Sequence, residues 1–281
     1  MSGRVAIVTD STADLGPLAA QHGIEVVPLT IRFGSEEFRD GVDLTEADFY
    51  RKLEASATTP ITAQPTPALF AQTYRRLLDG GADRIVSIHL PATLSGTINA
   101  AAIAANEVGD GKVDVLDSRS VSAGIGILAL DAARRAAAGE DVDAIASALR
   151  ADVPKVQLFA TIPSLTYLAR GGRIGQLSGL VGNVLKIVPI LTMVDGTLKE
   201  HAKVRTFQRA VDQIVDIATE RLSGTHGARV AVIHSMAPDL AQSVAGRISS
   251  VADLGSLYIS TIGPTVGTHA GPGVVGTIFI V

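Results

Sequence analysis

Short apolar runs alternate along this chain with segments of helical spacing. Four runs in the first half are rich in β-branched residues and bounded by turn formers, which predicts strands: RVAIVTD, IEVVPLTIRF, DRIVSIHL and KVDVLDS. Between them, PALFAQTYRRLLDGG and SGTINAAAIAANEVG repeat apolar residues every three or four positions and end in glycine, as helices do. Strands that alternate with helices usually form a parallel sheet covered on both faces. The pattern therefore predicts a doubly wound α/β domain.

The pattern changes after a predicted helical pair over residues 122–149. The stretch VPILTMVDGTLKEHAKVRT predicts two strands joined by a turn at Asp195-Gly196. A helix over residues 206–222 follows, and then strand ARVAVIHS, helix DLAQSVAGRISSVAD and strands SLYISTIG and GVVGTIFIV. Hairpins mixed with crossovers favour a mixed sheet. We expect a smaller C-terminal α/β domain of this kind.

Length and composition limit the number of domains, the kinds of partner and the chemistry that we expect of this chain. With 281 residues, of which 47% are hydrophobic, the chain is long enough for two cores, so we expect domains over residues 1–160 and 161–281. The net charge is −4 and the charges are mixed, which argues against a nucleic-acid partner. The absence of cysteine excludes disulfides and thiolate catalysis. The histidines show no metal-ligand spacing, so we expect no metal site.

No segment predicts export or a membrane span. The N-terminal MSGRVAIVTD is too short for a signal-peptide core, and we expect a cytoplasmic protein. The most apolar stretch, GLVGNVLKIVPILTMV at residues 179–194, is interrupted by Lys186 and Pro189. It falls short of the roughly 20 residues that span a bilayer. A buried helix followed by a strand is the expected structure.

Hydroxyl-bearing residues follow the first predicted strand, where open parallel sheets bind ligands. Asp10, Ser11 and Thr12 stand at this strand exit. Capping of the following helix explains one or two of them, and lining of a ligand site is the alternative.

Two further segments carry hydroxyls. In HLPATLSGTINA, Thr93, Ser95 and Thr97 surround Gly96 at a predicted helix start, where free N–H groups favour an anion. In TTPITAQPTPALF, prolines on both sides hold Thr62 in rigid, non-helical chain. An ordinary surface threonine before a helix is the simpler interpretation of Thr62.

These loops favour a ligand with at most one charge. None fits G-x-x-x-x-G-K-[ST] or an early G-x-G-x-x-G, so a nucleotide triphosphate lacks its usual partners. Hydroxyls and backbone amides can satisfy the two oxygens of a carboxylate. The glycine-rich GPTVGTHAGPG at residues 263–273 surrounds His269 and lets the backbone, at Gly271 for example, approach a ligand closely.

Seven motifs occur together in the order and approximate spacing of the DegV family: VTDSTADL, TAQPTP, LSGT, LDSRSVSAGIG, LARGGRI, KVRT and GTHAGPG. The chain resembles the fatty-acid-binding subunit of bacterial fatty acid kinase from Val5 to its C-terminus. The resemblance implies one long-chain fatty acid, such as palmitate or oleate, in a tunnel between the two domains, and no cofactor. It implies that Thr62, Ser95 and His269 bind the carboxylate.

In the family that the chain resembles, a separate ATP-dependent kinase subunit phosphorylates the presented carboxylate, and the acyl phosphate enters phospholipid synthesis. The binding protein itself is not an enzyme. Burial of about fifteen methylenes at ~0.8 kcal/mol each would supply on the order of 10 kcal/mol, so the tail can carry the affinity. One departure concerns Pro91-Ala92, where many members have a serine pair. The expected site-lining residues are Asp10, Ser11, Thr93, Gly96, Thr97, Gly271, Arg170 and Arg173.

Two pairs of basic residues allow two interpretations each. Arg170 and Arg173 flank a double glycine that ends a predicted helix; they compensate a helix C-terminus or brace the mouth of the site. Lys203 and Arg205 lie on one side of a predicted strand. They form a solvated edge or a contact for an acidic kinase partner, and the resemblance favours Arg205 as such a contact.

A serine hydrolase acting on an acyl ester is the alternative function. Ser95 would be its nucleophile, His269 its base and Asp10 the orienting acid. Against this, Ser95 stands in L-S-G-T and lacks the G-x-S-x-G elbow.

Overall fold

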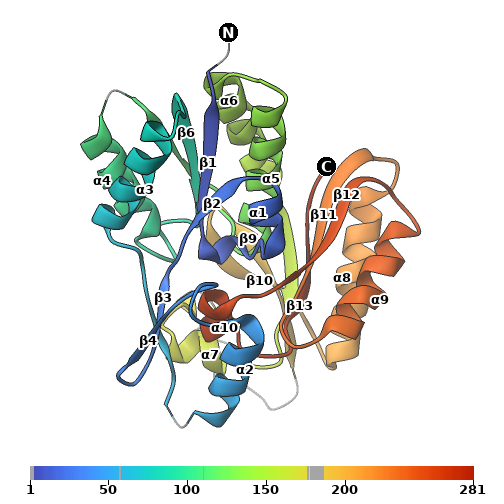
Figure 1. The fold of residues 1–281 in the computed structure, drawn as a ribbon. Helices are drawn as coiled ribbons and strands as arrows, with labels where there is room; N and C mark the ends of the chain where they lie inside the picture. The colour runs from blue at the N-terminus through green and yellow to red at the C-terminus, as the bar shows by residue number, and fades with distance from the viewer. Residues whose placement is uncertain (1–2, 57, 110, 176, 178–186) are drawn as a thin grey trace.

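A computed structural model describes residues 3–56, 58–109, 111–175, 177 and 187–281 (Figure 1). Its first sheet is wholly parallel, as predicted, with the order β2 (Ile24–Val27), β1 (Val5–Asp10), β6 (Arg84–His89) and β7 (Val113–Asp117). Helices α3 (Pro67–Asp79) and α4 (Thr97–Val108) cover one face, and α5 (Ala123–Ala137) and α6 (Val142–Asp152) cover the other. The doubly wound prediction is confirmed.

The strand order of this sheet creates a switch point between β1 and β6. The chain leaves β1 towards β2 on one side and later returns to add β6 and β7 on the other. Ligands in such sheets bind beyond the carboxyl ends of the strands at this point. Asp10 and His89 are the last residues of the two strands.

The second sheet has six strands and is mixed, as predicted. Only β11 and β12 run parallel to each other, and the other neighbours are antiparallel. The order is β10 (Thr197–Val204), β9 (Val188–Val194), β8 (Gln157–Thr161), β13 (Val275–Ile280), β11 (His226–His234) and β12 (Asp253–Thr261). Helices α8 (Phe207–Leu222) and α9 (Pro238–Ser249) cover its outer face, on the right of Figure 1.

The predicted hairpin forms at Asp195-Gly196, where φ is 49° and 73°. Positive φ at both central residues suits the right-handed twist of the flanking strands. The apolar stretch over residues 179–194 supplies β9, while its predicted helix lies outside the described residues.

One predicted strand is wrong in its extent. IEVVPLTIRF splits into β2 and β3 (Thr30–Phe33), because Pro28 has no N–H for a ladder and the chain turns into another sheet. There β3 pairs with β4 (Glu36–Arg39) and β5 (Ile61–Ala63). Helix α2 (Glu46–Ala55), capped by Thr45, lies below this sheet in Figure 1.

No helix was predicted within residues 263–273, where Pro264–Ala270 form helix α10. Two short α-helices, α1 (Pro17–Gln21) and α7 (Thr166–Arg170), and the two 3-10 turns η1 (Ser11–Ala13) and η2 (Val153–Lys155) complete the described elements. Among the described helices, none combines the length and apolar character that crossing a bilayer requires.

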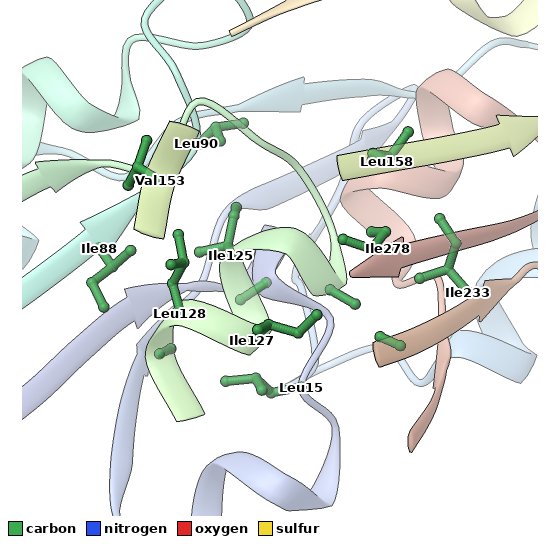
Figure 2. Close-up of a cluster of buried hydrophobic side chains, with 14 of the residues drawn as sticks. Leu15, Ile88, Leu90, Ile125, Ile127, Leu128, Val153, Leu158, Ile233 and Ile278 are labelled. Atoms are coloured by element: carbon green, nitrogen blue, oxygen red, sulfur yellow. The ribbon is translucent and has the colours of Figure 1, made fainter. Parts of the chain in front are cut away.

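Helix α5 lies between the two large sheets, and Figure 2 shows its side chains among theirs. Ile125 and Leu128 are fully buried in one apolar cluster with Ile88 of β6, Ile233 of β11 and Ile278 of β13. A helix that is apolar on most sides is expected in such a central position. The sheets therefore share one core through α5, while the domain division at residue 160 stays a prediction.

We predict that Ile125→Ala lowers the free energy of unfolding by about 2–5 kcal/mol, because it leaves a cavity between the sheets. Ile103→Ala is the matched control, since Ile103 lies on α4 and is 56% exposed. Its expected effect is within about 0.5 kcal/mol. Urea unfolding followed by circular dichroism measures both. Equal effects of the two substitutions would show that α5 is not the shared core.

Candidate functional site

A cavity of about 380 Å³ lies between the second sheet and the loops beyond the first. Its walls come from β8, β9, β10 and β11, from α7 and α10, from η1, and from the segments that hold Thr62 and Ser95. Small-molecule sites typically measure about 300–1,000 Å³. Thr62, Ser95 and His269, which come from three distant segments, all line it.

Most of the wall is apolar and comes from the inner face of the second sheet. Leu158 and Ala160 alternate along β8, and Ile162 continues the row; Leu191 and Met193 do the same along β9. Alternate residues share a face of a strand. Leu158, Ala160, Ile162 and Leu191 are buried. The cavity is therefore apolar in its interior.

Polar side chains gather at the solvent side of the cavity. Thr62 Oγ1 lies 2.9 Å from His269 Nε2. The Arg173 guanidinium donates from Nε to the Leu94 carbonyl at 3.3 Å, beside Ser95, and from Nη1 to the Gly171 carbonyl at 2.7 Å. Arg173 is exposed, whereas the apolar wall is not. We call Thr62, Ser95, Arg173 and His269 the polar rim.

Thr62 and Ser95 are held by local structure. Thr62 is the middle residue of β5 and pairs with Ile31 of β3. Ser95 stands just before α4, where its Oγ accepts the Thr97 N–H at 3.3 Å and lies 2.9 Å from Thr97 Oγ1. A Cβ added at Gly96 would lie 2.1 Å from Gln64 Oε1, so this glycine lets the two segments meet.

His269 is positioned by helix α10. Pro264 at the first helical position and Gly271 with φ of 75° after the last one mark its ends. These are start and stop signals that were available in the sequence. A Cβ added at Gly267 would lie 2.6 Å from Tyr50 Oη, so α10 packs closely on α2. Ser235 Oγ donates to the Gly271 carbonyl at 2.8 Å and fixes the other end.

The imidazole of His269 is neutral at physiological pH. Burial, together with the positive charge of Arg173, lowers its pKa to about 4. Its Nδ1 is buried and has no partner among the described residues. A Cβ added at Gly171 would lie 2.2 Å from this nitrogen. With Nε2–H donating to Thr62 Oγ1, the threonine hydroxyl proton stays available for a ligand. The structure therefore favours a neutral, hydrogen-bonding imidazole at His269 over a cationic one.

The structure places Asp10 and Ser11 away from the cavity surface. Asp10 Oδ2 lies 2.7 Å from His89 Nδ1, and both side chains are fully buried. Ser11 Oγ accepts the Leu29 N–H at 3.0 Å. Thr12, which also binds Asp10 through its hydroxyl, is the η1 residue that lines the cavity.

Other predicted lining residues stand behind the polar rim. The Thr93 hydroxyl donates to the Gly196 carbonyl and ties the first half of the chain to the β9–β10 turn. Gly96 and Thr97 support Ser95, and Gly271 ends α10. Arg170 is the exposed last residue of α7, and the glycines after it do end this helix. None of these five forms part of the described cavity lining, whereas Arg173 does.

The hydrolase constellation is not assembled. Asp10 pairs with His89, so the orienting acid is not at His269. The partners of His269 and Ser95 are Thr62 and Thr97. A serine nucleophile needs a base within hydrogen-bond reach, and Ser95 has none among the described residues.

The predicted partner contact lies on an exposed edge strand. Lys203 stands on β10, the outermost strand of its sheet, and its Nζ lies 3.2 Å from Glu200 Oε2. Arg205 is exposed just beyond the end of β10. Contact of this edge with a kinase stays a prediction.

Two buried carboxyl groups, Asp14 and Asp40, were missed by the sequence interpretation. Both hydrogen-bond to the start of α10, with Asp14 accepting from Gly263 and Asp40 from Thr265. Their partners are more than 220 positions away in the chain, so no local pattern reveals them.

Comparison with known proteins gives a consistent result. A family model described as "Uncharacterised protein, DegV family" matches residues 4–281. A DegV domain-containing protein of Streptomyces coelicolor is 39% identical over 280 residues, which is 99% of each chain. A structure described as fatty acid binding of a DegV family protein from Thermus thermophilus has 29% identity and a TM-score of 0.92, with 99% of each chain covered. DegV of Bacillus subtilis, described as a fatty acid binding protein, has 30% identity, a TM-score of 0.90 and 99% coverage of each chain.

We predict that His269 titrates with a midpoint near pH 4 in the folded protein and near its ordinary value of about 6.5 in urea. Because the folded-state pKa is lowered, its contribution to stability is complete above about pH 6.5. It is lost as the pH falls from there to about 4. Imidazole NMR, assigned with His269→Gln, measures the midpoint. A folded-state midpoint near 6.5 would contradict the buried, neutral imidazole.

Proposed function

This chain belongs to the DegV family, and on that premise we propose that it binds one long-chain fatty acid and presents the carboxylate to a separate ATP-dependent kinase subunit. The structural relatives described as fatty acid binding proteins support the first part. The kinase would transfer the γ-phosphoryl group of ATP to a carboxylate oxygen, which yields an acyl phosphate and ADP. The acyl phosphate would then serve phospholipid synthesis.

The observation that carries this proposal is the division of one cavity into an apolar interior and a polar rim. The buried wall of Leu158, Leu191 and Ile233 suits an alkyl chain. Each buried methylene contributes about 0.8 kcal/mol, so a chain of palmitate length gains most of its affinity there. The tail would point inwards and the carboxylate would lie at the solvent side.

The polar rim suits one carboxylate. The hydroxyls of Thr62 and Ser95 can each donate one hydrogen bond, and Arg173 supplies the positive charge. Neutral His269 would orient Thr62 and add no second cation. A carboxylate held mainly by neutral donors keeps electron density on the oxygen that must attack phosphorus. The exposure of Arg173 leaves this side open to a second protein.

The first test is direct identification of the ligand. The protein is purified from a bacterial host, extracted with organic solvent and analysed by mass spectrometry. We expect close to one long-chain fatty acid per chain. An empty cavity combined with turnover of an acyl ester would refute the carrier and support the hydrolase.

The second test distinguishes side chains that contact the carboxylate from those that contact the tail. We predict that Ser95→Ala and His269→Ala lower acyl phosphate formation with the kinase subunit of the same organism at least ~10-fold. Ser95→Ala removes a hydrogen bond to the charged carboxylate, which is worth about 1.5–3 kcal/mol, and His269→Ala removes the side chain that orients the Thr62 hydroxyl. The dissociation constant for palmitate, measured by calorimetry, should change less, since the tail contacts remain.

Two glycine substitutions extend this test. One is expected to disturb His269, and the other is the matched control. Gly171→Ala would push a methyl group against His269 Nδ1 and should reproduce the His269→Ala phenotype. Gly246→Ala on α9 meets no atom within 4 Å and should leave acyl phosphate formation unchanged. Unchanged turnover in Ser95→Ala or His269→Ala would show that the assignment of the polar rim is wrong.

A further inference from the structure

Helix α10 has no cap of its own at the end opposite His269. Its N-cap is Gly263, which has no side chain to accept a hydrogen bond, and its first residue is Pro264, which has no N–H. The helix has only seven residues, so its intrahelical hydrogen bonds are few. The position of His269 therefore depends on contacts that other segments make with this helix.

Two carboxyl groups from the first forty residues supply those contacts. Asp14 Oδ1 accepts the N–H of Gly263 at 3.0 Å, and Asp40 Oδ2 accepts the N–H of Thr265 at 3.1 Å. Both carboxyl groups lie within 4 Å of the point where a Cβ on Gly263 would stand. Asp14 follows β1 and η1, whereas Asp40 follows β4. Three parts of the chain are thereby fixed at one point.

The two carboxyl groups are buried without a cation. Asp14 is 8% exposed and Asp40 is 4% exposed. Across the described residues, neither forms an ion pair with Lys, Arg or His. Instead, Ser122 Oγ donates to Asp14 Oδ2 at 2.5 Å. An uncompensated buried carboxylate is destabilising, so the N–H groups and the positive dipole end of α10 are its main compensation.

We propose that Asp14 and Asp40 are positioning residues of the polar rim, which hold α10 through Gly263 and Thr265 and so fix His269 against Thr62. This inference rests on the proposed function, because it concerns how the carboxylate of a bound fatty acid is oriented. Neither residue lines the cavity, so neither contacts the tail. Loss of either carboxyl group should disturb the orientation of the fatty acid carboxylate and leave the tail in place.

The raised pKa values of Asp14 and Asp40 indicate a role beyond capping the start of α10. Burial raises the pKa of Asp14 well above its ordinary value and that of Asp40 to about 6. The negative charge of Glu46 opposes ionisation of both groups, and that of Asp40 also opposes ionisation of Asp14. Tyr50 and Tyr258 face the pair as neutral phenols. Because these folded-state pKa values are raised, the stability they contribute is complete below about pH 4. The part contributed by Asp40 is lost as the pH rises through about 6.

An asparagine at either position would offer a neutral acceptor without this loss of stability. A buried pair of carboxyl groups that lowers stability as the pH rises is typical of residues that serve function. A charged acceptor holds an N–H more firmly than a neutral one. Above about pH 6, where Asp40 is ionised, this difference is the advantage that its carboxylate gives to the start of α10.

The test uses palmitate labelled with ¹³C at its carboxyl carbon and bound to the full chain. Wild-type protein should give one narrow carboxyl line, shifted from that of free palmitate. In Asp14→Ala and Asp40→Ala the line should broaden or move towards the free position, and the His269 ring signals should shift with it. Palmitate affinity should fall less than ~3-fold. Asp131→Ala, which removes a buried carboxylate paired with Arg134 and Arg135, should keep the wild-type line.

The outcomes separate this inference from the proposed function. No binding of labelled palmitate by the wild type would overturn the proposed function itself. Binding with wild-type carboxyl and His269 signals in both alanine variants would overturn only the positioning role. Should an alanine variant not fold, the asparagine variant at that position decides. We expect at least ~10-fold faster hydrogen exchange of the Gly263 and Thr265 amides there, and exchange at the wild-type rate would count against the proposal.

Discussion

A hydrogen bond between Thr62 and His269 joins two segments that lie 207 positions apart in the chain. The rest of the candidate site depends on this contact, because it fixes where the polar rim lies relative to the apolar wall. It forms between a short edge strand and the last turn of a short helix, neither of which has much stability of its own. Its geometry is therefore set by packing: Tyr50 against Gly267, Gly171 against His269, and the buried aspartates at the start of α10.

The cavity follows from the way the two large sheets share a core. Helix α5 fills the space between them over most of its length, with Ile125 and Leu128 fully buried. Beyond its N-terminus, where Ser122 lines the cavity, α5 no longer covers the inner face of the second sheet. The loops after β1 and β6 and helix α10 close this space instead. An apolar interior with polar residues at one side results from ordinary sheet packing, and fatty acid binding is the function that we infer from it.

The sequence predicted the large elements well, because they repeat a clear period. The helices and strands around Ile88, Ile125 and Ile278 all belong to segments with such a period. The secondary-structure predictions failed where single proline or glycine residues, and not the hydrophobic period, decide where an element begins or ends. Pro28 ends β2 inside an apolar run, and in the GPTVGTHAGPG stretch the glycines concealed a helix that Pro264 and Gly271 delimit.

The candidate site was harder to predict from short sequence motifs. Pattern alone identified Thr62, Ser95 and His269 as separate polar positions, and the family resemblance grouped them; the structure then places all three on one cavity. Asp14 and Asp40 could not be assigned in this way, because their roles depend on backbone N–H groups of distant residues. Asp10 stood next to a predicted site, but the buried His89 on the adjacent strand binds it instead.

A crystal structure of the protein with palmitate would show whether the cavity holds the fatty acid with its carboxylate at the polar rim. We expect the alkyl chain along Leu158, Leu191 and Ile233, and the carboxylate within about 3.2 Å of Thr62 Oγ1 and Ser95 Oγ. A cavity without the acid, or a carboxylate directed away from both hydroxyls, would contradict this expectation.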